Sequence, residues 1–113
     1  MAKESIKLAG QSGLAIAASV EGASDGMPVI LAHGGGQTHR AWKRVSTLLA
    51  SHGFHAIALD LRGHGNSEWA KDGAYDIADF AGDLIAIAAR LESKPALIGA
   101  SLGGLAGIMA EGH

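Results

Sequence analysis

The 113-residue sequence predicts an α/β fold in which an antiparallel hairpin precedes parallel βαβ units. Largely apolar runs at residues 28–32, 54–59 and 96–99 lack polar alternation, which is typical of strands buried on both faces. Segments with apolar residues at helical spacing separate these runs. A glycine-rich turn follows each run, where a strand would give way to a helix.

The N-terminal segment predicts a hairpin that leads into the first parallel strand. Residues 5–8 and 14–20 show the alternation of strands, and the polar, glycine-containing residues 10–13 connect them. After a loop rich in Gly, Ser and Asp, the all-apolar run 28–32 ends in three consecutive glycines that follow His33. This run therefore predicts a buried strand with a bare turn at its end.

A first helix is predicted between Thr38, a suitable N-cap, and Gly53, a suitable residue just past a helix end. The following run, residues 54–59, predicts a strand that leads into a polar, glycine-rich loop at residues 60–67. The apolar residues of this helix recur at helical spacing: Trp42, Val45, Leu48 and Leu49.

A second helix is predicted after Asp76, and the Ser-Lys-Pro sequence at residues 93–95 ends it. We interpret Asp79 and Asp83 as a solvated face with charge near the cap, rather than as a catalytic carboxylate pair. The small residues at 103–110 predict a third helix packed close to the sheet. The second helix has one apolar stripe: Ile77, Phe80, Ala81, Leu84, Ile87, Ala88 and Leu91.

Composition excludes several functional classes. Nine basic and eleven acidic residues give a net charge of −2 with no basic run, so neither nucleic acid nor an anionic membrane is an expected partner. No apolar run reaches the roughly 20 residues of a membrane span, and residues 14–20 make a poor secretory signal. The chain has no cysteine, which is compatible with the cytoplasmic location that we expect.

No metal site and no cofactor are predicted, because the histidines have no metal-ligand spacing. We interpret His64 as a hydrogen-bonding group that orders its loop. The six histidines are distributed over loops, a helix, a strand and the terminus: His33, His39, His52, His55, His64 and His113.

The Gly-Ala-Ser-Leu-Gly sequence at residues 99–103 predicts a nucleophile elbow, a tight strand-to-helix turn that projects a reactive serine hydroxyl. Ser101 is the candidate nucleophile. Gly99 and Gly103 flank it because side chains at these positions would clash with the bent backbone. The helix that follows directs its N-terminal amides at the site, which favours developing negative charge.

An oxyanion hole is predicted from two turns. The backbone amide of Leu102, which follows the serine, would be one donor, and the amide of Gly35 or Gly36 would be the other. A flexible strand-to-helix turn without this role is the alternative interpretation of the glycine run.

Three motifs together resemble the N-terminal half of the α/β-hydrolase fold superfamily: His-Gly-Gly-Gly at residues 33–36, Asp-Leu-Arg-Gly-His-Gly-Asn-Ser at 60–67, and the elbow. The resemblance is closest to the branch of esterases, lipases and cofactor-free haloperoxidases. It implies that residues 60–65 form a mainly structural loop. It also implies acyl-enzyme chemistry on a small-molecule acyl substrate, because Ser101 stands where epoxide hydrolases and haloalkane dehalogenases use an aspartate.

In this fold the catalytic acid and histidine follow the serine on later strands. Glu111 and His113 lie at the far end of the helix that leaves the elbow, about 10 Å or more from Ser101. Residues 1–113 are thus expected to form a partial domain with an incomplete sheet, inactive alone. The alternative is a noncatalytic module that pairs with another chain, or with itself, through an exposed edge strand. The acyl substrate stays open.

Overall fold

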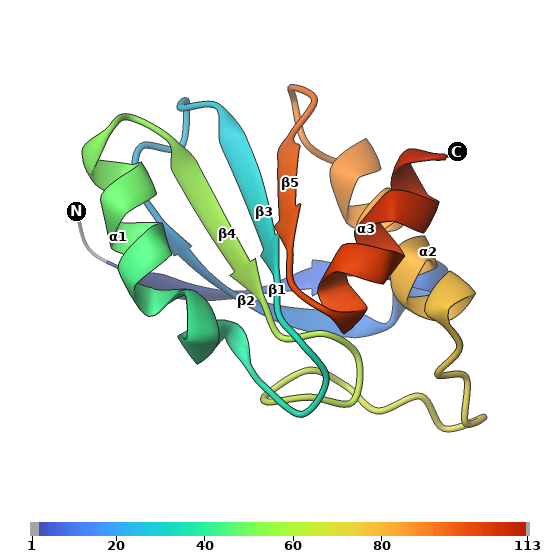
Figure 1. Cartoon of the computed structure of the whole chain (residues 1–113). Coiled ribbons are helices and arrows are strands. Elements are labelled where there is room, and N and C mark those ends of the chain that lie inside the picture. The colour runs from blue at the N-terminus through green and yellow to red at the C-terminus, as the bar shows by residue number, and fades with distance from the viewer. Residues whose placement is uncertain (1–2, 113) are drawn as a thin grey trace.

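The computed structural model describes residues 3–112, and its central feature is a five-stranded sheet with the order β1-β2-β4-β3-β5 (Figure 1). The strands are β1 (Glu4–Ala9), β2 (Ala15–Glu21), β3 (Pro28–Ala32), β4 (His55–Leu59) and β5 (Ala96–Gly99). The helices are α1 (Lys43–Ser51), α2 (Ile77–Ala89) and α3 (Leu102–Glu111), with 3-10 turns at Gln11–Gly13 and His39–Trp42.

The sheet joins an antiparallel part to a parallel part. Strands β1 and β2 form the predicted hairpin, and β2 also pairs antiparallel with β4. Strand β3 lies parallel between β4 and β5, and all five of its residues are buried. The α/β prediction, with an antiparallel hairpin before parallel βαβ units and an incomplete sheet, is confirmed. Strand β5 pairs only with β3 among the described residues and forms one edge.

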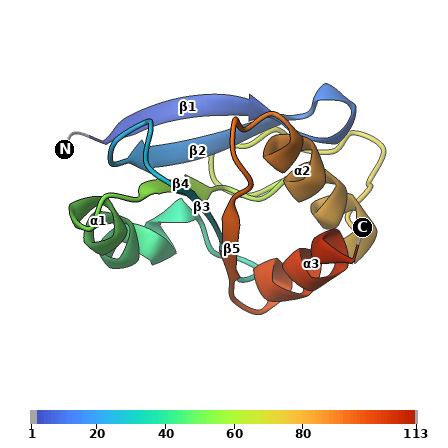
Figure 2. The same ribbon diagram turned by 90° about the horizontal axis from the view of Figure 1, so that it is seen from above.

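Helices cover both faces of the parallel strands (Figure 2). Helix α1 packs on one face, where alternate residues such as Val29 and Leu31 meet Trp42 and Leu49. Helices α2 and α3 pack on the other face, where Ile30 lies in the larger core cluster. The alternation along β3 therefore divides one strand between two apolar layers. That larger cluster also contains Ile16, Ile57, Leu59, Leu61, Phe80, Leu84, Ile87 and Ala106.

Two details differ from the predicted helices. The segment after Thr38 begins as a 3-10 turn, in which the Thr38 hydroxyl accepts a hydrogen bond from the Arg40 amide at 3.3 Å, before α1 starts. Leu48 is 60% exposed, so its place in the apolar stripe was wrong. At the start of α2, Asp76 and Asp79 form a capping box, as the cap-proximal interpretation of Asp79 implied.

The carboxyl ends of β3, β4 and β5 lie at the same edge of the sheet, so the turns that leave them converge there (Figure 1). Parallel strands make this convergence unavoidable, because their carboxyl ends point the same way. No helix in the described range, residues 3–112, is long and apolar enough to cross a membrane.

Candidate active site

Ser101 lies in the turn between β5 and α3, in a backbone conformation that side chains rarely adopt. Its φ is 53° and its ψ is −115°, and its side chain is exposed. Ser12 is the only other described residue apart from glycine with a positive φ. Such a conformation costs about 1–3 kcal/mol and persists only where the surrounding structure imposes it. The sharp turn expected at this position is therefore present.

Two glycines and three backbone hydrogen bonds impose the turn. A Cβ atom on Gly99 would lie 2.6 Å from the Gly103 carbonyl, and one on Gly103 would lie 2.1 Å from the Ala32 oxygen. The amide of Ala100 donates to the Ala32 oxygen at 3.1 Å, and the Gly103 amide donates to the His33 oxygen at 3.1 Å. The Leu105 amide donates to the backbone oxygen of Ser101 at 2.9 Å, and this bond begins α3. The turn is thus packed directly on the end of β3.

The glycines that follow β3, residues 34–36, lie against the Ser101 turn; we call them the glycine turn. A Cβ atom on Gly34 would be 3.5 Å from the Ser101 Cβ, and one on Gly35 would be 3.9 Å from the Leu102 side chain. Within residues 3–112, neither the Gly35 amide nor the Leu102 amide donates a hydrogen bond. The Gly36 amide donates to His64 Nε2 at 3.1 Å, so the suggestion of Gly36 as a free donor does not hold in this conformation.

Asp60, the first residue of the loop after β4 (residues 60–67), connects this loop to His39, which follows the glycine turn. The carboxylate is fully buried and accepts hydrogen bonds from the His39 amide at 2.7 Å, the His39 ring at 2.8 Å and the Asn66 amide at 3.0 Å. Burial alone would raise the pKa of Asp60, but the bonds from Asn66 and His39 outweigh it and lower that pKa. Asp60 is therefore a charged, fully bonded connector.

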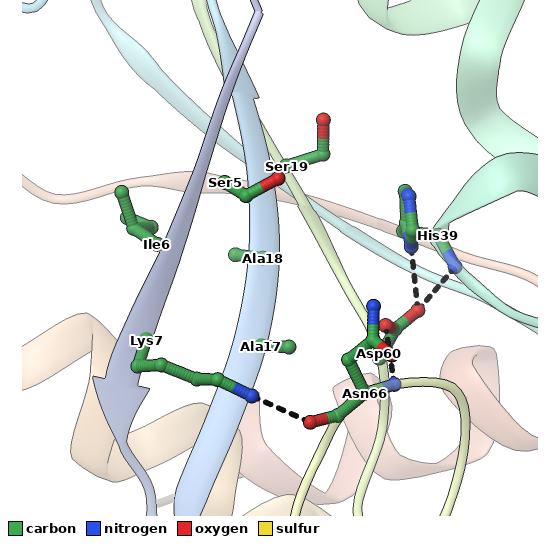
Figure 3. Close-up of a pocket in the computed structure, with 9 residues that line it drawn as sticks. All are labelled: Ser5, Ile6, Lys7, Ala17, Ala18, Ser19, His39, Asp60 and Asn66. Atoms are coloured by element: carbon green, nitrogen blue, oxygen red, sulfur yellow. Dashed lines mark hydrogen bonds and ion pairs between the residues drawn. The ribbon is translucent and has the colours of Figure 1, made fainter.

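The same carboxylate lines a polar cavity of about 380 Å³ between the hairpin and the loop after β4. Figure 3 shows His39 pointing at Asp60, and the Lys7 side chain extending from β1 across β2 to Asn66, whose backbone carbonyl accepts from it at 2.6 Å. Ser101 does not line this cavity. The cavity and the nucleophile turn are thus different places on the molecule.

Arg62 and Asp83 form a buried, two-pronged ion pair that the sequence analysis missed. Arg62 Nε and Nη2 each donate to the Asp83 carboxylate at 2.7 Å, and the Gln11 amide donates to it at 2.9 Å. The solvated-face interpretation of Asp83 was wrong, since its exposure is 2%. The bond to Asp83 raises the pKa of Arg62. Asp83 directly precedes Leu84 and follows Phe80 by three positions, so its place beside the apolar stripe was the available signal.

No histidine or carboxylate is hydrogen bonded to the Ser101 side chain within residues 3–112. Three or more His, Asp or Glu side chains grouped to hold a metal ion are also not found in that range. His113, expected to be remote from Ser101, lies outside the described residues. The described site consists of an exposed serine, two unbonded amides and the start of a helix.

The comparison with known families matches residues 29–112 to the Alpha/beta hydrolase family. The chain belongs to this family. The match begins in β3 and includes the glycine turn, the loop after β4 and the Ser101 turn. The superfamily resemblance inferred from the three motifs is thereby confirmed.

Individual members of the hydrolase family show how much of a whole protein the chain represents. It is 37% identical over 84 residues to a non-heme chloroperoxidase from Streptomyces lividans, covering 74% of this chain and 30% of that protein. Its structure is similar to the epoxide hydrolase VrEH1 from Vigna radiata, with a TM-score of 0.87, 25% identity and coverage of 96% and 35%. It is also similar to a thioesterase domain from the curacin biosynthetic pathway, with a TM-score of 0.88, 27% identity and coverage of 97% and 40%. The chain spans about a third of these relatives.

Proposed function

We propose that this chain carries the nucleophile-bearing part of a serine hydrolase that acts on ester or related acyl bonds. The observation that carries the proposal is the strained backbone of Ser101, whose φ of 53° is imposed between β5 and α3. Strain of this kind is concentrated at functional sites, where it presents a side chain that a relaxed turn would turn away. Family membership supports the reaction class, since the relatives include hydrolases of several kinds.

In the proposed reaction, Ser101 Oγ attacks the acyl carbon of a small-molecule substrate and forms a tetrahedral intermediate. The amides of Gly35 and Leu102 donate to its oxyanion, and the N-terminus of α3 adds a favourable partial charge. Collapse releases the alcohol and leaves an acyl-enzyme, which water hydrolyses. A serine supports this acyl chemistry over epoxide opening, despite the similarity to VrEH1, and the proposal requires no cofactor.

The acid and histidine of the triad follow the serine in the chain order of this family. We therefore propose that residues beyond those of this chain supply them in a whole protein. Without a histidine, a serine hydroxyl is hardly ionised near neutral pH, and the loss in rate is on the order of 10⁶. The proposed location is the cytoplasm, with which a cysteine-free chain is compatible.

The test is hydrolysis of p-nitrophenyl acetate by the chain and by a hybrid. The chain alone should show no turnover above background that depends on Ser101. A hybrid that continues residue 112 with the matching C-terminal part of the Streptomyces lividans chloroperoxidase should hydrolyse the ester. Ser101→Ala in the hybrid should abolish turnover. Ser101-dependent turnover by the chain alone would contradict the inactivity, and a folded hybrid whose turnover survives Ser101→Ala would contradict the assignment of the nucleophile.

A second candidate function is a noncatalytic module that pairs with a second copy through β5. The observation that favours it is the open edge of β5 beside a patch of exposed apolar side chains. The exposed apolar residues of β5 and α3 are Ile98 (39%), Leu105 (54%), Ile108 (72%) and Met109 (40%).

Size-exclusion chromatography with light scattering tests this second function. A monodisperse dimer with hydrogen-exchange protection at residues 96–99 would support it, and Ile98→Lys should convert such a dimer to monomer. Leu48→Lys is the control, because Leu48 is an exposed apolar residue on α1, which lies away from β5 on the other face of the sheet. A monomer, or an aggregate of undefined size, would count against the module.

A further inference from the structure

Two histidines join the glycine turn to the loop after β4 in a reciprocal way. His33, at the end of β3, accepts a hydrogen bond at Nε2 from the Leu61 amide at 2.9 Å. His64, in the loop after β4, accepts a hydrogen bond at Nε2 from the Gly36 amide at 3.1 Å. Each segment thus donates one backbone amide to an imidazole of the other. The two rings lie beside each other, with centroids 5.0 Å apart.

The partners of each ring define its protonation. His33 Nδ1 lies 2.7 Å from the Gly34 oxygen, and His64 Nδ1 lies 2.9 Å from the Arg62 oxygen. A carbonyl oxygen can only accept, so Nδ1 carries the hydrogen in both rings; an amide can only donate, so Nε2 is bare. Both imidazoles are therefore neutral in this arrangement. A proton on His64 Nε2 would oppose the Gly36 amide with a second donor and break that bond.

Gly34 is buried against the Ser101 turn, but little besides hydrogen bonds holds Gly35 and Gly36 in place. A Cβ atom on Gly36 would meet nothing within 4 Å, and one on Gly35 would meet only the Leu102 side chain at 3.9 Å. The turn's other hydrogen bonds are local and all involve Gly34. The Gly34 amide donates to the Gln37 side chain at 3.0 Å, and the Gly34 oxygen accepts from the Gln37 amide at 3.1 Å and from His33 Nδ1 at 2.7 Å. The bond to His64 is thus the contact that ties the Gly36 amide to the rest of the fold.

We propose that His64 is a positioning residue: its neutral Nε2 holds the Gly36 amide and so sets Gly35 opposite Leu102, and protonation of the ring releases the turn. The consequence for catalysis rests on the proposed hydrolase function, because only an oxyanion donor at Gly35 makes the position of this turn important. The hydrogen bond and its response to a proton do not depend on that function.

Other groups around His64 also carry charge or titrate, so the test must separate their effects from its own. His33 differs from His64 because it is fully buried, and burial lowers the pKa of His33. Phe80 of α2 contacts His64 edge-on, with centroids 6.4 Å apart. The charged and titratable groups on the surrounding elements are His33 and His39 after β3, Asp60 and Arg62 on the same loop as His64, Tyr75 before α2, and Asp83 on α2.

The test is NMR of the ¹⁵N-labelled 113-residue chain. At about pH 8, a coupling through the hydrogen bond should connect the Gly36 amide nitrogen with His64 Nε2. As the pH is lowered until the His64 ring shifts report protonation, the coupling should vanish and the protection of the Gly36 amide against exchange should fall about tenfold. Absence of the coupling at about pH 8, or protection that is unchanged across the His64 titration, would overturn the proposal.

Three variants separate His64 from its titrating neighbours. His64→Gln keeps an acceptor that does not titrate, so the protection of the Gly36 amide against exchange should stay constant as the pH is lowered. In the wild type this protection should fall in a step. His64→Leu should leave Gly36 weakly protected throughout. His52→Gln, at the exposed end of α1, should retain the wild-type step. A pH step that persists in His64→Gln would overturn the proposal, and this variant and the wild-type titration decide the matter even if His64→Leu does not fold.

Ser101→Ala distinguishes this inference from the proposed function. The coupling should survive that substitution, because Ser101 makes no bond to His64 or Gly36. If the chain shows the coupling but the hybrid hydrolyses no ester, the hydrogen bond between His64 and Gly36 is supported and the proposed hydrolase function is contradicted.

Discussion

The loops that follow β3 and β4 and the segment from β5 to α3 meet at one edge of the sheet, but different forces hold them. In the loops, buried polar side chains accept hydrogen bonds from backbone amides: His33 accepts from the Leu61 amide and Asp60 from the His39 amide, and both side chains have zero exposure. In the Ser101 segment, close backbone packing at Gly99 and Gly103 holds the turn in place, and β5 forms an open edge of the sheet. We expect the first region to be sensitive to charge and the second to be sensitive to volume.

The largest effect should come from breaking the buried ion pair of the loop region. Asp83→Ala leaves Arg62, itself 5% exposed, without its partner, and should lower the free energy of unfolding by about 3–5 kcal/mol. That is a large part of the stability of a small domain, which is about 5–15 kcal/mol. Urea unfolding measures the loss. Glu92→Ala, at an exposed carboxylate just after α2, is the control, and an equal loss in both variants would contradict a special role for the pair.

The next effect tests the Ser101 segment with two adjacent glycines. Gly103→Ala puts a methyl group 2.1 Å from the Ala32 oxygen, and should lower the free energy of unfolding by about 1–3 kcal/mol or more. Gly104→Ala meets nothing closer than 3.4 Å and should be neutral or stabilise α3 by up to about 1 kcal/mol. The difference between the two urea midpoints measures the packing of the turn. Equal midpoints would show that volume does not limit this segment.

A smaller effect should come from relieving the backbone strain at Ser101. Ser101→Gly removes the Cβ atom from a residue with φ of 53° and should raise the free energy of unfolding by about 1 kcal/mol, after the entropic cost of glycine. Ser101→Ala keeps the Cβ atom, so its unfolding should match that of the wild type. Should both variants gain equally, the hydroxyl rather than the backbone would be the source of the strain.

The smallest effect at neutral pH is the pH dependence of stability that His33 causes. It should be absent at neutral pH and should increase as the pH falls. Burial lowers the pKa of His33 below its ordinary 6.5, so the unfolded chain takes up this proton first as the pH falls. The stability that the neutral ring contributes is therefore complete above pH 6.5 and is lost below it. Asp60, whose pKa is also lowered, loses its contribution only below its ordinary 3.8.

Urea unfolding at pH values between 3.8 and 6.5 measures how much the free energy of unfolding falls when His33 is protonated. His33→Gln, which has no titrating ring, should flatten the decline just below pH 6.5. A slope as steep in the variant as in the wild type would assign the decline to other histidines.

The fold was largely predictable because its signals are local. Period-2 alternation predicted the hairpin, continuous apolar runs predicted the parallel strands, and period-3.6 spacing predicted the first two helices. The Gly-x-Ser-x-Gly pattern predicted a sharp turn at Ser101. Leu48 was misplaced because the buried residues of α1 are Ser46 and Ala50, and at 3.6 residues per turn Leu48 lies on nearly the opposite side of the helix. The oxyanion donors at Gly35 and Leu102 stay a prediction.

Long-range polar partners were not predictable in the same way. Asp83 and Arg62 are 21 residues apart, and His64 and Gly36 are 28 apart. Spacing along the chain contains no information about such pairs, because the partner is chosen by how two elements cross. An aspartate on a helix is most often solvated, and only the meeting of α2 with the loop after β4 changed that outcome for Asp83.

By itself, the sequence determined the order of strands and helices and the turn that carries Ser101. These features depend on backbone sterics and on apolar spacing over a few residues. Only the tertiary structure decided that β2 pairs with β4 and that two imidazoles join the turns beside Ser101. Those contacts close long loops, so their free energy is gained only when the whole sheet assembles.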